Sequence, residues 1–169
     1  MRLAFTVALT LALLWALVAQ VNHVLTGVRV YLFVGSLFLT YAALKLPLHA
    51  GLGATLLGGL ICDANAPVDF GTHTLLFAAA HAIVFNLRDG LPRDDTIARV
   101  IVALLTNLAL FLVFSFIQIA SSPAPAAAWP RLIVDLLCSQ VFLAFVAPWF
   151  FALQHRSLVL VRAERELAE

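Results

Sequence analysis

The run IARVIVALLTNLALFLVFSFIQIA, residues 97–120, is the clearest apolar stretch in the chain. A helix needs about 20 consecutive, mostly apolar residues to cross the hydrocarbon layer of a membrane. This run has that length and carries a single charged residue, Arg99, close to its start. It therefore predicts a membrane-spanning α-helix.

The composition of the whole chain points to lipid as its solvent. Of its 169 residues, 63% are hydrophobic and 11% are charged. Soluble domains are usually about 45–50% apolar and about 25% charged, so one small soluble core could not hide this much apolar surface. The formal net charge of +1 does not indicate a nucleic-acid partner. We therefore expect an integral membrane protein in contact with membrane lipid.

Apolar runs separated by short polar breaks cover most of the sequence. The runs are Leu3–Val21, Val30–Leu46, Ala50–Cys62, Phe70–Leu87, Ile97–Ala120 and Leu132–Leu153. This pattern predicts an all-α fold, a polytopic integral membrane bundle of about six transmembrane helices in residues 1–155. A short charged tail, residues 156–169, follows, and we expect it to continue as a helix beyond the membrane.

The placement of the basic residues predicts the orientation. With six spans and the amino terminus inside, eight of the ten Lys and Arg residues fall in cytoplasmic segments. Only Arg29 and Arg131 then lie outside. Cytoplasmic loops of membrane proteins carry such an excess of basic residues. We therefore expect a multi-pass membrane protein with both termini in the cytoplasm; the resemblance described below implies the bacterial inner membrane.

Two of the runs leave an alternative open. The first resembles a signal peptide, but its length and the lack of an A-x-A cleavage site favour a retained helix. The third is short and contains Gly58 and Gly59. Small residues allow helices in lipid to approach closely, so we expect this run to be buried among other helices. A re-entrant or kinked segment is the alternative.

A polar cluster lies between the third and fourth runs, in GGLICDANAPVDFGTHTLLF, residues 58–77. Asp69 precedes a helix start, where a carboxylate can cap unpaired N–H groups. Asp63 follows the apolar LIC directly, so it is either a solvated turn residue or an ionisable group at membrane depth, where such groups are expensive. We expect Asp63 and His73 to tie neighbouring helices together. His73 and His81 lie on nearly the same helix face, and we expect both to form interhelical hydrogen bonds.

Other polar residues lie inside the last two runs. Asn107 is expected to bond to a partner helix. Arg131 and Asp135 are four positions apart, a spacing that allows an ion pair on the surface of a helix. We expect this pair to neutralise a charge near the membrane interface.

The sequence does not specify an enzyme. Gly51 and Gly53 form G-x-G without the rest of a dinucleotide fingerprint, and no P-loop lysine follows the later glycines. Asp63, Asp69 and His73 could supply three metal ligands, but their spacing matches no recognised metal site. We therefore expect no catalytic residue, no cofactor and no metal.

The region around the polar cluster resembles the rod shape-determining protein MreD family. Members of that family are similar in layout to this chain: a glycine-rich span, then G-x-x-x-D, a small or polar turn, and a glycine that opens a long apolar helix. Here these positions are Gly59, Asp63, residues 64–70 and Gly71. The resemblance in layout covers almost the whole chain, and the residue-level resemblance covers about twenty residues.

The resemblance implies a non-enzymatic part of the bacterial cell-elongation machinery, which would help to regulate cell shape. Its partners would be MreC, the actin-like MreB, a SEDS-type glycosyltransferase and a penicillin-binding transpeptidase, and it would couple MreB and MreC to peptidoglycan synthesis. Gly58, Gly59, Asp63, Gly71 and His73 are then structural or interaction residues. The alternative is the substrate-binding subunit of an energy-coupling-factor vitamin transporter, in which Asp63, Asn65 and Asp69 would line a substrate pocket.

Overall fold

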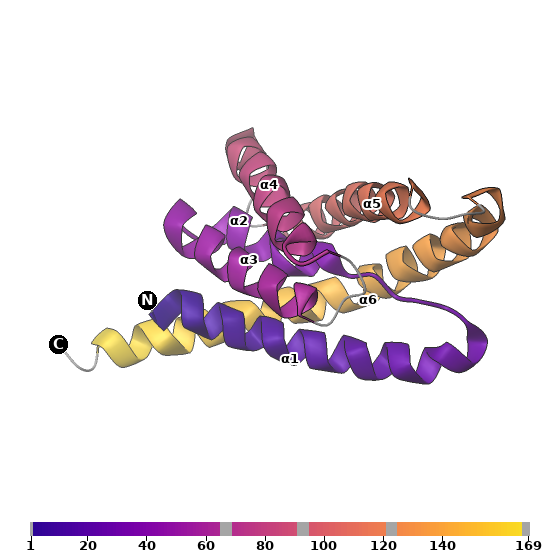
Figure 1. Ribbon diagram of the computed structural model, residues 1–169. Coiled ribbons are helices and arrows are strands. Elements are labelled where there is room, and N and C mark those ends of the chain that lie inside the picture. The colour runs from indigo at the N-terminus through magenta and orange to yellow at the C-terminus, as the bar shows by residue number, and fades with distance from the viewer. Residues whose placement is uncertain (1, 65–68, 91–94, 121–124, 167–169) are drawn as a thin grey trace.

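The computed structural model describes residues 2–64, 69–90, 95–120 and 125–166. These residues form helices and connecting coil, and no β-strand occurs among them. The all-α class is therefore confirmed for the described part of the chain. The α-helices, in chain order, are α1 Arg2–Leu25, α2 Thr40–Lys45, α3 Leu48–Asp63, α4 Thr72–Leu87, α5 Thr96–Ala120 and α6 Pro125–Glu166 (Figure 1).

Three helical stretches within the described residues are long and apolar enough to cross a membrane. They are Leu9–Val28, Thr96–Ala120 and Ala128–Val159, on α1, α5 and α6. Most of their side chains are not buried, and exposed leucines and valines lie along all three, with exposed isoleucines and phenylalanines on α5 and α6. This apolar surface suits contact with membrane lipid. The shorter α3 is also apolar, and it matches the predicted third run.

The last helix is much longer than the run Leu132–Leu153 that predicted it. It extends from Pro125 to Glu166 and contains Pro130 and Pro148. A proline inside a helix removes one backbone hydrogen bond and tends to kink the chain, yet α6 remains one element. The helix passes residue 156 without a break, so the charged tail begins inside a helix, as expected.

The second run, Val30–Leu46, is not the spanning helix that its composition predicted. Residues 30–34 form no regular secondary structure, Gly35–Phe38 form the 3-10 helix η2, and Thr40–Lys45 form the short α2. All side chains from residue 32 to residue 44 are buried. We refer to residues 30–46 as the buried segment. Its hydrophobicity reflects burial inside the protein instead of a lipid-facing helix.

Side chains from three long helices bond to the backbone of the buried segment. The Asn22 amide on α1 donates to the Leu32 carbonyl at 3.0 Å and accepts from the Leu32 N–H at 2.8 Å. The Asn107 amide on α5 donates to the Phe33 carbonyl at 3.0 Å and accepts from the Ser36 N–H at 3.3 Å.

Two residues of α6 complete this set of bonds. The Asp135 carboxylate accepts from the Tyr31 N–H at 2.9 Å, and the Ser139 hydroxyl accepts from the Phe33 N–H, also at 2.9 Å. A buried backbone N–H or C=O without a partner costs free energy. These side chains therefore make a non-helical backbone tolerable in the interior.

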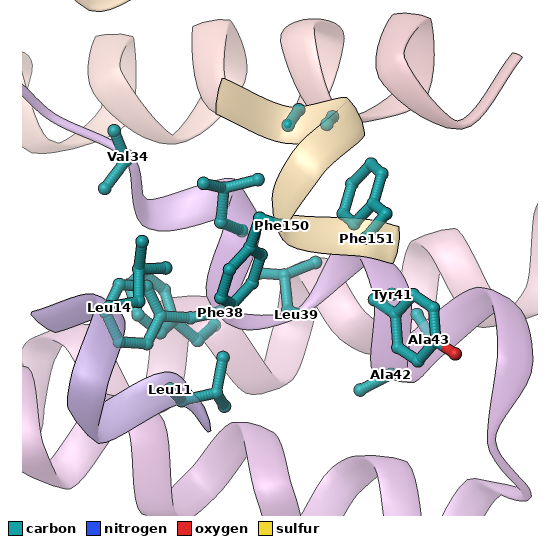
Figure 2. Close-up of a cluster of buried hydrophobic side chains, with 14 of the residues drawn as sticks. Leu11, Leu14, Val34, Phe38, Leu39, Tyr41, Ala42, Ala43, Phe150 and Phe151 are labelled. Atoms are coloured by element: carbon teal, nitrogen blue, oxygen red, sulfur yellow. The ribbon is translucent and has the colours of Figure 1, made fainter. Parts of the chain in front are cut away.

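The hydrophobic core surrounds the buried segment. Figure 2 shows Leu11 of α1, Phe38 of η2 and Phe150 of α6 converging near Leu39. Tyr41 stacks on Phe151 with ring centroids 6.1 Å apart. The core therefore joins both ends of the chain to the segment between α1 and α3.

α1 and α6 run along each other, and the two chain ends lie at the same end of the bundle (Figure 1). α3 packs closely on α4 and also contacts α1. The carboxyl end of α3 and the amino end of α4 lie against each other, and this meeting point holds most of the residues that the sequence singled out.

Candidate functional site

Asp63, the last residue of α3, lies at the centre of the polar cluster. Its side chain is buried, and its two oxygens accept hydrogen bonds from two consecutive residues of α4. Oδ1 accepts from the His73 backbone N–H at 2.8 Å and lies 2.9 Å from His73 Nδ1. Oδ2 accepts from the Thr74 N–H at 3.0 Å and from the Thr74 hydroxyl at 2.6 Å. Asp63 is therefore an interior residue that joins two helices.

This carboxylate caps α4 from a neighbouring helix. The first N–H groups of a helix lack partners within the helix, and an acidic group near them is favourable. Asp69 was expected to provide this cap, and that expectation is wrong. The N-cap position is Gly71, and the exposed Asp69 contributes only its backbone carbonyl, which accepts from the N–H and hydroxyl of Thr72.

Two glycines allow the helix ends to come together here. Gly71 has φ +98°, a left-handed backbone that residues with a side chain rarely adopt. A Cβ on Gly59 would lie 2.6 Å from the Cα of Thr74, so α3 and α4 are in backbone contact at this point. Gly59, Asp63, Gly71, His73 and Thr74 together form what we call the α3–α4 joint.

Gly58 lies on a different face of α3 from the joint. A Cβ added there would meet Phe38 Cδ1 at 3.1 Å and Leu11 Cδ1 at 3.3 Å. Gly58 therefore packs α3 against α1 and the buried segment. The two adjacent glycines serve two different helix contacts.

His73 connects the joint to α5. Its ring stacks on Phe114 with centroids 4.4 Å apart and meets Phe77 edge-on at 5.8 Å. Nδ1 faces the Asp63 carboxylate, which fixes the orientation of the ring. His81, two turns further along α4, is fully buried and lies 3.1 Å from the Thr55 hydroxyl through Nδ1. Both histidines thus contact α3, but through separate partners.

A cavity of about 240 Å³ opens beside the joint. It is surrounded by α1, by residues 31–38 of the buried segment, and by residues of α3 and α4. Trp15, Phe33 and Phe77 are among the apolar residues that line it, and Asn22 and His73 are among the polar ones. The cavity does not include Asp63, because both carboxylate oxygens face α4.

The described residues contain no group of three or more His, Cys, Asp or Glu side chains that could hold a metal ion. Asp63 and His73 do come together, but the exposed Asp69 does not join them. Asn65 lies outside the described residues. The arrangement can therefore hold α3 and α4 together, and His73 also lines the neighbouring cavity.

Sequence reasoning missed the residues that hold the buried segment. We made no prediction for Asn22 and Ser139. Asn107 was expected to bond to a partner helix, but it bonds to the backbone of the buried segment. Asp135 lies 3.8 Å from Arg131, the expected pair, but it is buried and also accepts the Tyr31 N–H. The available signal in the sequence was a polar residue in or next to each long apolar run. This signal could not show which backbone group the polar residue would bond to.

Comparisons with known proteins do not place the chain in a family. No protein-family model, no curated protein and no solved structure matches it. The resemblance to the MreD family therefore stays a prediction from the sequence.

Proposed function

We propose that this chain is a non-enzymatic membrane component of the bacterial cell-elongation machinery. In this role it spans the inner membrane with both termini in the cytoplasm. It helps to couple MreB and MreC to peptidoglycan synthesis by a SEDS-type glycosyltransferase and a penicillin-binding transpeptidase. The proposal combines the MreD-like layout with the way in which the structure uses its polar residues.

The observation that carries the proposal is the α3–α4 joint. Of the residues of the resemblance, Gly59 and Asp63 both contact the start of α4, and Gly71 is the N-cap residue of that helix. Within the described part of the chain, the Asp63 carboxylate bonds to His73 and Thr74, both on α4. A carboxylate used in this way builds a rigid support and is poorly placed to act on a substrate, because catalytic groups must reach the reacting atoms.

The rest of the interior supports the same interpretation. Asn22, Asn107, Asp135 and Ser139 all bond to the backbone of the buried segment. The polar groups at these positions thus maintain an unusual fold. An assembly subunit needs such a fixed shape, since its partners must recognise a defined surface.

The transporter alternative has less support. It requires Asp63, Asn65 and Asp69 to line a substrate pocket, whereas Asp63 is buried against α4 and Asp69 is exposed away from the cavity lining. The cavity of about 240 Å³ is the feature that favours a small-molecule role. Co-purification of a vitamin with the chain would support this alternative.

A depletion experiment in the native bacterium tests the proposal. We expect rod-shaped cells to become round when the chain is depleted. Wild-type protein and the Asp69→Leu variant should restore the rods, whereas Asp63→Leu should not. Affinity purification of the wild-type chain should recover MreC. Cells that stay rod-shaped on depletion, with no MreC in the purified sample, would contradict the proposal.

A further inference from the structure

The cavity beside the α3–α4 joint has walls without formal charge. No Lys, Arg, Asp or Glu occurs among the described residues that line it. Aromatic side chains dominate instead: Trp15, Phe33, Phe38 and Phe77 contribute, together with aliphatic residues of α1. Burying an unpaired charge here would be costly. A ligand suited to these walls is therefore neutral and mostly apolar.

The polar groups in the cavity walls differ in whether they can still form a hydrogen bond with a ligand. The Asn22 amide is committed to both the N–H and the carbonyl of Leu32. His73 uses Nδ1 for Asp63. No described residue forms a hydrogen bond with the other ring nitrogen, Nε2. His73 is also one of the residues that line the cavity.

The Asp63 contact determines the chemistry of Nε2. A carboxylate oxygen that faces Nδ1 selects the tautomer with the proton on Nδ1, because two acceptors cannot share a hydrogen bond. Neutral His73 then presents Nε2 as an acceptor. The ring cannot easily turn away, since it stacks on Phe114 at 4.4 Å. The matching ligand group is a donor without charge, such as a hydroxyl.

We propose that this cavity binds a neutral amphiphile, a long-chain alcohol in chemical class, whose hydroxyl donates to His73 Nε2 while part of its chain lies among the aromatic residues. The cavity is smaller than the about 300–1,000 Å³ of sites for drug-sized ligands. It therefore takes one chain end and its hydroxyl, and the remaining chain extends into the surrounding lipid. This site goes beyond the proposed role in cell elongation and does not depend on it.

Trp15 lines the cavity and provides a direct reporter. The other tryptophans, Trp129 and Trp149, are 37% and 80% exposed, so both can be replaced by phenylalanine. The full-length double variant is placed in phosphatidylcholine vesicles, whose headgroup carries no hydroxyl. A terminally brominated long-chain alcohol is added, and quenching of Trp15 fluorescence is measured against the brominated alkane of equal length.

We expect quenching by the alcohol to saturate at lower concentration than quenching by the alkane. His73→Phe keeps a ring against Phe114 but removes the acceptor. It should weaken the apparent affinity for the alcohol about two- to tenfold, the equivalent of one hydrogen bond. The affinity for the alkane should not change. Equal loss for both probes, or no loss for either, would overturn the role of Nε2.

A second variant tests the cavity itself. Ala19 is partly exposed and lines the cavity from α1, so Ala19→Leu adds volume there without touching the joint. Saturable quenching should disappear for both probes, while the thermal unfolding temperature stays close to that of the parent. Quenching that rises linearly with probe concentration in the parent would show partition into lipid alone and would refute the site.

Discussion

At the scale of single residues, Asp63 and Asp69 show how little a residue type says about its role. Both flank the same turn and both are acidic. Asp63 is buried and accepts from two backbone N–H groups and from the hydroxyl of Thr74, whereas Asp69 is exposed. The two residues differ in burial because the end of α3 packs against the start of α4. This packing does not follow from the local sequence.

Replacing Asp63 by leucine should therefore destabilise the protein strongly. The change removes the cap of α4 and leaves the His73 and Thr74 N–H groups without acceptors. We expect a loss of about 2–4 kcal/mol in the free energy of unfolding, measured by thermal unfolding in detergent. Asp69→Leu, the matched control, should change it by less than about 0.5 kcal/mol. Equal tolerance at both positions would show that Asp63 is an ordinary turn residue.

The glycines of α3 allow an equally sharp comparison. In Gly59→Ala the new methyl group meets the backbone of Thr74 at 2.6 Å, so α3 and α4 must separate. We expect a destabilisation of about 1–3 kcal/mol. Gly53→Ala has no atom within 4 Å of the new Cβ and should stabilise the helix by up to about 1 kcal/mol. Urea or thermal unfolding of the two variants in detergent would give the sign of each effect.

At the scale of elements, the buried segment depends on other helices for its conformation. Its strongly apolar sequence is compatible with a helix, yet residues 30–34 form no helix. Helical backbone satisfies its own hydrogen bonds, whereas irregular backbone needs external partners. Asn22, Asn107, Asp135 and Ser139 provide them from α1, α5 and α6.

Asn107→Leu should loosen this segment selectively. It leaves the Phe33 carbonyl and the Ser36 N–H without partners. We expect amide hydrogen exchange in residues 31–38 to become at least about tenfold faster, as a cost of 1.4 kcal/mol or more implies. Mass spectrometry of exchanged peptides would detect the change. Asn86→Leu, on the exposed face of α4, is the control. Unchanged exchange in Asn107→Leu would contradict the support role.

At the scale of the whole molecule, the apolar helices and the position of the helix ends bear on how the chain crosses a membrane. Three stretches are long enough to cross a membrane, and the ends of α1 and α6 lie at the same end of the bundle (Figure 1). The cytoplasmic location of both chain ends stays a prediction from the excess of basic residues that the sequence places in the expected cytoplasmic segments.

Reporter fusions test this topology. A reporter after Glu169 and one inserted after Gly90 should both be active on the cytoplasmic side. A reporter inserted after Ala120 should be active on the opposite side. The positive-inside bias and the six crossings predicted from the sequence lead to this expectation. A periplasmic reporter after Glu169, or a chain that stays soluble without lipid or detergent, would refute the membrane topology.

The sequence by itself determined the all-α class, the three long apolar helices, and the positions of α3 and α4. Hydropathy carries this information because a run of apolar residues must avoid water wherever it lies. The same rule explains the error in residues 30–46, since apolar side chains suit a lipid-facing helix and a buried irregular chain equally well.

Only the tertiary structure decided which polar groups meet. Asn22 bonds to a residue 10 positions away, but Asn107, Asp135 and Ser139 bond to residues between 71 and 106 positions away. A hydrogen bond depends on distances of about 3 Å, and the packing of α1, α5 and α6 around the buried segment sets those distances. The helix-forming runs were therefore readable from the sequence, whereas the α3–α4 joint and the support of residues 30–46 exist only in the folded chain.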